Sequence, residues 1–303
     1  MAAPKDVRDR VEKLREAINR YRHAYHVHDR EEIPIEALDA LKHELATLEE
    51  EYPELVTPES PTQRVAGEAL PQFQKVSHTV PQWSFNDAFT EDEVRAFDER
   101  VRKNIAQEFG DISYTYTAEL KIDGLKIVLT YEKGVLKTAA TRGDGAVGED
   151  VTHNVRTIES VPLTLTQPVD AVVEGEVWMG KRALERLNKS RKEEGEPEFR
   201  NPRNAAAGSI RQLDPKVAAA RKLDTFIYDL ASFSGDLPQT QWEELDLLRD
   251  LGFKVNREAV RAGSINEVLA FWKSWFKKKD KQDFLIDGVV VKVNERKYQE
   301  VLG

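Results

Sequence analysis

The chain has 303 residues, of which 33% are charged and 40% hydrophobic, the balance of a globular protein with enough length for a large core. Its apolar runs are too short to cross a bilayer, and its first residues lack the apolar segment of a signal peptide, so the sequence predicts a cytoplasmic protein without a membrane partner. The absence of cysteine excludes disulfides and cysteine-based zinc sites, and the net charge of −9 argues against broad attraction to nucleic acid.

Two paired helices are predicted at the N-terminus. Apolar and aromatic residues recur at steps of three and four from Val7 to Tyr25, and again from Leu38 to Tyr52. A cluster of prolines after Tyr52 ends this pattern. We therefore expect a helical subdomain over residues 1–72 and a second domain over residues 73–303.

The second domain is expected to be built mainly from antiparallel sheet. From Tyr114 the apolar period changes to two, and Asp-Gly and Lys-Gly pairs mark hairpin turns. Further strands are expected at residues 171–179, 225–230 and 288–293, with helices at 181–194, 241–251 and 265–278. The predicted fold class is α+β, with a helical N-terminal subdomain ahead of the sheet domain.

Charged residues stand at regular positions in three of these strands. Glu119, Lys121 and Asp123 share one face because residues two apart on a strand project to the same side. A surface ladder of ion pairs is the commoner explanation for one such triplet taken alone. However, Glu174 and Glu176 share one face of another apolar strand, and residues 286–293 repeat the combination of turn, apolar run and isolated charge. Three such strands predict a site centred on Lys121.

The motifs around these strands resemble those of the nucleotidyltransferase family of DNA ligases and capping enzymes. Lys121 to Gly124 is similar to the family's nucleophile motif Lys-x-Asp-Gly, and further motifs follow in family order at residues 141–145, 174–177, 201–209 and 287–292. Together they resemble a bacterial NAD-dependent DNA ligase from the N-terminus to the last residue. The resemblance implies a helical nicotinamide-mononucleotide-binding subdomain followed by an adenylation (nucleotidyltransferase) domain, in a monomeric bacterial enzyme.

The resemblance also implies the reaction. Lys121 would attack the adenylyl phosphorus of NAD, release nicotinamide mononucleotide and carry AMP for transfer to the 5′-phosphate of a nick in double-stranded DNA, during replication and repair. Attack needs a neutral amine, but a free lysine with a pKa of about 10.4 is neutral about once in a thousand near neutral pH. Carboxylates beside it favour the charged form, so cations must dominate when NAD is bound. We therefore expect a Mg²⁺ requirement, with the metal ligands unassigned and no zinc within these residues.

Site residues are carried over from the family position by position. The catalytic group implied by the resemblance is Lys121, Asp123, Asp287 and Lys292. The residues implied around the adenosine and its phosphate are Ser84, Phe85, Glu119, Arg142, Glu176, Tyr228 and Lys292. A core position is an equal alternative for Tyr228. Arg203 and Arg211 match arginines that lie near the active site and the nick.

The nicotinamide half of the site departs from the family pattern. Tyr25, His26 and Asp39 match it, but Ile35 stands in place of an aspartate and Leu38 in place of a stacking tyrosine. Leu38 also fits the apolar stripe of the second helix. An ATP-using ligase or capping enzyme is therefore one alternative function, and a non-catalytic binding module derived from a ligase is another.

The end of the chain also departs from the family pattern. Residue 303 comes before the family's last adenylation motif and before the C-terminal domains that the resemblance implies. We expect either an expression fragment or a natural short form that binds nicked DNA firmly only with those domains.

Two further segments suggest other functions. Residues 143–148 satisfy the Gly-x-Gly-x-x-Gly pattern of dinucleotide-binding folds, but the preceding strand belongs to a hairpin, so we reject that fold. An aromatic cluster followed by lysines at residues 271–279 has the composition of a nucleic-acid surface. We expect helix packing there instead, because Ile265, Leu269, Trp272 and Phe276 would form one stripe.

Overall fold

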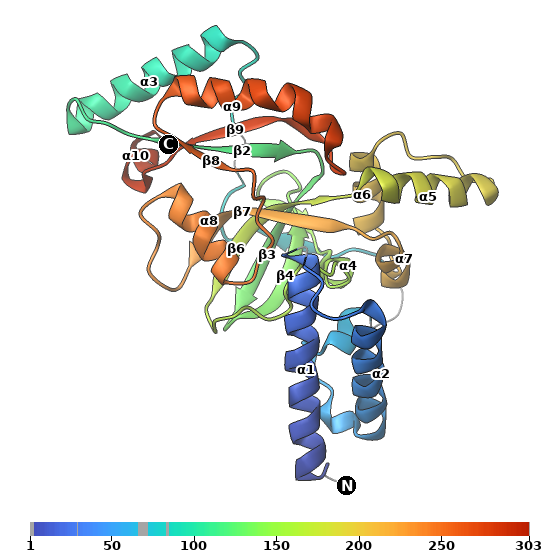
Figure 1. The fold of residues 1–303 in the computed structure, drawn as a ribbon. Helices are drawn as coiled ribbons and strands as arrows, with labels where there is room; N and C mark the ends of the chain where they lie inside the picture. Colours follow the sequence, from blue (N-terminus) through green and yellow to red (C-terminus); the bar gives the residue numbers. More distant parts are fainter. Residues whose placement is uncertain (1–2, 29, 66–71, 83–84, 303) are drawn as a thin grey trace.

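The computed structural model describes residues 3–28, 30–65, 72–82 and 85–302. Two helices, α1 (Lys5–His26) and α2 (Ile35–Glu51), project from one end of a larger sheet domain (Figure 1). Val11, Leu14 and Ile18 of α1 pack against Leu38 and Leu45 of α2. The two predicted helices are confirmed, and their apolar stripes form a small core of their own.

Buried arginines fasten the helical pair to the sheet domain. The pair is followed by two 3₁₀ turns, η1 (Pro53–Leu55) and η2 (Pro61–Val65). Arg64 in η2 is buried and donates hydrogen bonds to the carbonyl oxygens of Arg156, Ile158 and Val161 at 3.0, 3.0 and 2.8 Å. Arg22 in α1 donates to the carbonyl oxygen of Glu159. Backbone acceptors take the terminal nitrogens of Arg64, and Glu159 lies 3.9 and 4.0 Å from the Nε atoms of Arg22 and Arg64, so the charge of both buried guanidinium groups is partly compensated.

Three antiparallel sheets make up the second domain. The strands of the four-stranded sheet, in spatial order, are β4 (Val135–Thr141), β3 (Leu125–Glu132), β6 (Ala171–Trp178) and β7 (Asp224–Phe233). Those of the three-stranded sheet are β8 (Val260–Ala262), β2 (Tyr116–Ile122) and β9 (Ile286–Val293). A small sheet pairs β1 (Lys75–Ser77) with β5 (Val147–Glu149). The α+β prediction is confirmed, and the expected strands lie within a few residues of the observed ones.

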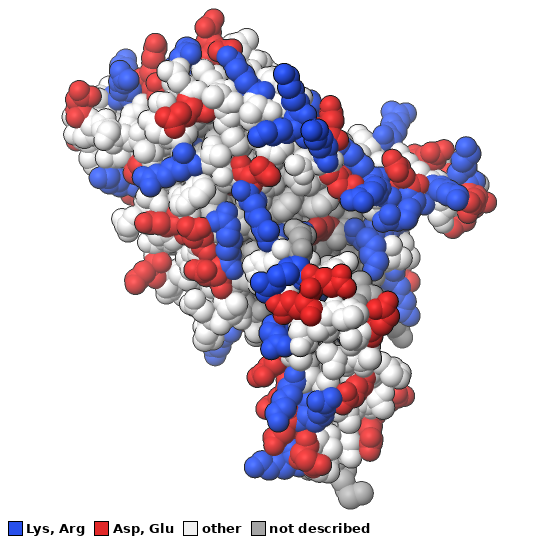
Figure 2. Space-filling view, viewed as in Figure 1, with Lys and Arg blue, Asp and Glu red and all other residues white. Residues whose placement is uncertain are grey.

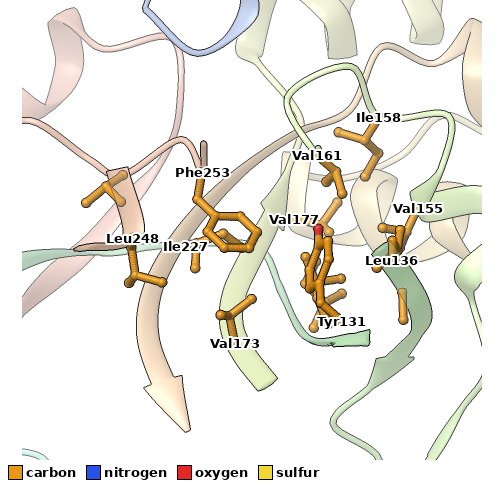
Figure 3. Close-up of a cluster of buried hydrophobic side chains, with 14 of the residues drawn as sticks. Tyr131, Leu136, Val155, Ile158, Val161, Val173, Val177, Ile227, Leu248 and Phe253 are labelled. Atoms are coloured by element: carbon orange, nitrogen blue, oxygen red, sulfur yellow. The ribbon is translucent and has the colours of Figure 1, made fainter. Parts of the chain in front are cut away.

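Helices cover one face of each larger sheet. The four-stranded sheet carries α4 (Thr152–Val155), α6 (Pro202–Ile210) and α8 (Gln241–Asp250) over its main core, part of which is drawn in Figure 3. Figure 1 shows the three-stranded sheet beneath α3 (Glu91–Phe109) and α9 (Ile265–Lys278), with α10 (Arg296–Leu302) at its edge. The remaining helices are α5 (Lys181–Glu193), α7 (Pro215–Ala220) and η3 (Lys279–Lys281). The opposite faces of the two sheets are thereby left to form a site.

The sequence analysis missed several helices, of which α3 is the longest. It begins with a capping box, in which Thr90 accepts from the Glu93 backbone and the Glu93 side chain accepts from the Thr90 backbone. Only a narrow part of α3 is buried, at Val101 and Ile105. That stripe is too sparse among the charged residues to produce a clear helical period.

The apolar stripe predicted along α9 was wrong at Phe276, near the C-terminal end of the helix. Trp275 is buried, whereas Phe276 is 55% exposed. Trp275 and Phe271 of α9 lie in an apolar cluster with Leu120 of β2 and Trp178 of β6, and Phe276 is not part of this cluster. No described helix has the length and apolarity that crossing a membrane requires.

The rejected dinucleotide-binding pattern at residues 143–148 forms the turn between β4 and β5. Gly143 has φ +58°, and a Cβ there would lie 1.8 Å from the Val147 carbonyl oxygen. The helix that follows, α4, spans four residues. A tight turn between the two strands therefore explains Gly143, and the rejection is confirmed because the preceding strand β4 pairs with β3 as a hairpin.

Candidate active site

The two larger sheets turn their charged faces toward each other. In β2, Leu120 and Ile122 lie in an apolar cluster with Trp275 of α9, so Glu119 and Lys121 project from the other face. In β6, Val173 and Val177 lie in the main core, which leaves Glu174 and Glu176 on the face opposite. A side-chain contact across the gap, described below, shows that these faces meet in one cleft.

Lys121 lies at the open mouth of the cleft. Its side chain is 47% exposed, and its Nζ donates to Asp287 Oδ2 of β9 at 3.0 Å. Asp123, just after β2, is paired with Arg203 of α6 at 3.2 Å. The next residue, Gly124, brings β2 close to β6, since a Cβ there would lie 2.2 Å from the Val177 carbonyl oxygen. The Asp-Gly turn thus places Lys121 and Asp123 beside the charged face of β6.

Lys292 lies at the floor of the cleft and is buried there. Its Nζ reaches Glu119 Oε1 of β2 at 3.4 Å and Asp229 Oδ1 of β7 at 3.3 Å, and it donates to the Tyr228 carbonyl oxygen at 3.1 Å. Burial alone would lower the pKa of Lys292, but the carboxylates of Glu119, Asp229 and Glu244 raise it above its usual value. The floor therefore holds a lysine that stays charged.

Two acidic groups in the cleft hold protons more tightly than usual. Burial raises the pKa of Glu119, against the lowering effect of Lys292. Burial also raises the pKa of Glu176 to about 7, although Arg203 and Lys121 oppose the shift. Perturbed carboxyl groups in a cleft are typical of functional sites.

Tyr228 faces the cleft as well. Its ring centroid lies 5.8 Å from Lys292 Nζ, and burial together with Glu176 and Glu174 raises the pKa of its phenol. Tyr228 is therefore buried beside charged groups of the cleft.

Three further predicted residues, Arg142, Arg211 and Phe85, are exposed at the surface. Arg142 lies exposed in the turn after β4, and Arg211 pairs with Glu149 of β5 at 2.7 Å. Phe85 is 66% exposed. Ser84 lies outside the described residues.

The predicted nicotinamide residues lie on the helical pair. Tyr25 and His26 meet edge to face, with ring centroids 4.9 Å apart. Burial lowers the pKa of His26 to about 4, so its imidazole is neutral at neutral pH. Asp39 is exposed beside Lys42, and the side chain of Ile35 lies outside the described residues. Leu38 is 5% exposed in the core between α1 and α2, which agrees with the apolar-stripe alternative.

Sequence reasoning missed Asp229, which contacts Lys292. In a regular strand Asp229 and Tyr228 would point to opposite faces, but a register shift in the β6–β7 pairing pairs Glu174 with Asp229 and Gly175 with Ile227. This bulge lets consecutive residues serve the same site. An isolated Tyr-Asp pair in a strand gives no sign of such a shift.

Comparisons with known proteins identify relatives of both parts of the chain. Residues 70–303 match the family described as NAD-dependent DNA ligase adenylation domain, and residues 4–66 match the DNA ligase-like, N-terminal NAD+-binding domain. The chain is 48% identical over 294 residues to a DNA ligase of Brevibacillus brevis and 47% identical over 300 residues to one of Thermotoga petrophila. These alignments cover 97% and 99% of this chain but 43% of each relative, so the chain spans less than half their length. A solved mycobacterial DNA ligase D, complexed with ATP and MES, aligns with 60% of this chain and 49% of its own at 14% identity and a TM-score of 0.35, too low to carry an argument.

Proposed function

Because the chain belongs to the NAD-dependent DNA ligase family, with an N-terminal NAD+-binding domain and an adenylation domain, we propose that Lys121 takes AMP from NAD. The observation that carries this proposal is the pair of lysines in one cleft. Lys121 is exposed at the mouth, where it can reach a substrate, and Lys292 is buried at the floor among carboxylates. The division proposed is a nicotinamide-mononucleotide-binding subdomain over residues 1–72 and an adenylation domain over residues 73–303.

The reaction exchanges one bond to phosphorus for another. Lys121 Nζ attacks the adenylyl phosphorus, the bond to the oxygen of the nicotinamide mononucleotide phosphate breaks, and a phosphoramide forms. The amine proton passes to water at the open mouth. Asp287, 3.0 Å from Nζ, orients the amine, and Asp123 is held beside it by Arg203. The charged Lys292 lies where it can stabilise the phosphate oxygens as their charge grows.

The floor of the cleft suits an adenine nucleoside. Glu119 Oε1 is buried and pairs with Lys292 at 3.4 Å without a hydrogen bond within the described part of the chain, so we assign it as acceptor for the adenine amino group. Tyr228 offers a ring for stacking on a purine. Glu176 is the residue that we assign to the ribose hydroxyls.

The nicotinamide half of NAD is assigned to Tyr25 and His26 on α1. A neutral His26 can donate one hydrogen bond and accept another, and Tyr25 is partly exposed beside it. Asp39 supplies a carboxylate on the neighbouring helix. Leu38, in the core of the pair, is left out of the proposed contacts.

Mg²⁺ is proposed to enter with the substrate. The described residues contain no group of three His, Asp or Glu side chains arranged to hold a metal ion. Mg²⁺ commonly keeps several waters and binds through phosphates and one or two carboxylates, so a built cage is not needed. When bound, it would neutralise charge on the phosphates.

Nicked double-stranded DNA is the proposed acceptor of AMP, in the bacterial cytoplasm and with a monomeric enzyme. Figure 2 shows Lys and Arg gathered over α5 and the C-terminal end of α9, despite the overall charge of −9. Arg203, beside Asp123, and Arg211 are the residues assigned to the nick. Phosphate contacts of this kind depend strongly on salt.

A donor competition tests the proposal. The chain is incubated with Mg²⁺ and with NAD or ATP labelled in the adenylyl group, and the labelled peptide is mapped. We expect label from NAD on Lys121, and none after the Mg²⁺ is chelated. Label from ATP alone would favour an ATP-using relative, and no label from either donor, with the fold intact, would favour a non-catalytic module.

A further inference from the structure

Lys292 is surrounded by charged groups from four other elements. Glu119 comes from β2, Asp229 from β7, Glu244 from α8 and Arg296 from the start of α10. Burial and the nearby Asp229 together raise the pKa of Glu244 to about 7, against the lowering effect of Lys292. Three carboxylates therefore lie near Lys292, and each makes different contacts.

Glu244 is committed to other partners. Its Oε1 accepts from the Leu230 backbone at 2.9 Å, and its Oε2 accepts from Arg296 at 2.5 Å. Glu119 Oε1 lies within ion-pair distance of Lys292 Nζ but does not form a hydrogen bond with it. Asp229 is left as the carboxylate that accepts a hydrogen bond from Lys292, at 3.3 Å.

Asp229 also lies between protein and solvent. Its side chain is 34% exposed, whereas that of Lys292 is 7% exposed. The β-bulge at Tyr228 and Asp229 directs its carboxylate into the cleft. A phosphate entering the cleft can therefore replace Asp229 as the partner of Lys292, while the displaced carboxylate turns to water.

We propose that Asp229 is a positioning residue, which keeps Lys292 charged and aimed at the phosphate position until the nucleotide arrives. The inference rests on the proposed function, in which Lys292 meets the nucleotide. Without Asp229, the buried ammonium loses a counter-charge, and desolvation favours its neutral form. The pKa of Lys292 would then fall, and its neutral form, which cannot pair with phosphate, would appear at a lower pH than in the unmodified chain.

The direct test is an NMR titration of the chain labelled with ¹³C-lysine, in which the Lys292 signal is identified by its loss in Lys292→Arg. In Asp229→Asn the titration midpoint of Lys292 should fall by about one unit or more. Asp229→Glu should restore it. The matched control is Asp236→Asn, which removes an exposed aspartate in the loop after β7 and should leave the midpoint unchanged. An unshifted midpoint in folded Asp229→Asn would overturn the proposal.

A kinetic test uses the pH profile of self-adenylation. In Asp229→Asn, kcat/KM for NAD should fall at high pH, with a limb that matches the NMR midpoint, and Asp229→Glu should remove that limb. A uniform loss of rate at all pH values would indicate a structural role instead and would count against the proposal. If Asp229→Asn does not fold, Asp229→Ser and Asp229→Glu provide the same comparison.

The two proposals fail in different ways. If the unmodified chain takes no AMP from NAD, the proposed function fails, but the NMR titration still measures the Asp229 contact. If the unmodified chain is adenylated and Asp229→Asn matches it in both measurements, the positioning role alone fails.

Discussion

The mouth and the floor of the cleft hold two lysines in opposite environments. At the mouth, Lys121 and Asp287 form an ion pair with 47% and 42% of their side chains exposed. At the floor, Lys292 and Glu119 are 7% and 9% exposed. Exposed ion pairs contribute about 0–1 kcal/mol, whereas removing one partner of a buried pair costs roughly 3–5 kcal/mol. The mouth can therefore release its lysine to a substrate at little cost, while the floor holds its lysine in place.

The largest effect is expected at the mouth. Lys121→Ala should abolish adenylation, by more than about a thousandfold, because the nucleophile is gone. Transfer of label from NAD measures the loss, and circular dichroism measures the fold. Lys137→Ala, an exposed lysine of β4 that pairs with Glu132, is the matched control. A labelled Lys121→Ala protein would refute the assignment of the nucleophile.

A substitution of Lys292 at the floor of the cleft should lower both adenylation and stability. Lys292→Met leaves Glu119 and Asp229 without their shared cation, so the free energy of unfolding should fall by about 3 kcal/mol. Adenylation should fall by about a hundredfold. Urea unfolding and the labelling rate measure the two effects. The loss of stability should shrink at acidic pH, because Glu119, whose pKa is raised, can then become neutral.

A buried lysine outside the cleft separates these two effects. Lys254 is buried and pairs with Asp224 at 2.8 Å. Lys254→Met should destabilise the chain but leave labelling of the folded fraction unchanged. Equal losses of labelling in the two variants would mean that Lys292 acts through stability alone.

Glu176 is expected to give a smaller, pH-dependent effect. Its folded pKa of about 7 lies above its ordinary 4.5, so the folded chain binds more protons between these values. Its contribution to stability should therefore decline as pH rises from about 4.5 to 7, while its ability to hold ribose as a carboxylate grows. KM for NAD should rise about tenfold from pH 8 to pH 6, and Glu176→Gln should remove this pH dependence. Glu185→Gln, exposed on α5, is the control, and an unchanged pH profile in Glu176→Gln would exclude the role.

Local sequence patterns predicted the cleft residues of β2 and β6, because which face of a strand a residue occupies follows from strand alternation. Glu119 and Lys121, and likewise Glu174 and Glu176, lie two apart, so their shared faces follow from the sequence. The same argument failed at Asp229, because a bulge depends on pairing with a neighbouring strand. It also could not find Arg64, whose three acceptors lie more than ninety residues away along the chain. Contacts of that kind are set by tertiary packing, which local periodicity does not record.

The smallest effect is expected at Asp287, the partner of Lys121. Asp287→Asn removes an exposed ion pair, so the free energy of unfolding should change by less than about 0.5 kcal/mol. Adenylation should slow by about threefold, since the amide can still hold the amine while water takes its proton. Urea unfolding and the labelling rate at low and high salt measure both effects. A loss of stability near that of Lys292→Met would mean that the mouth holds its lysine as firmly as the floor does, and the distinction between the two lysines would have to be abandoned.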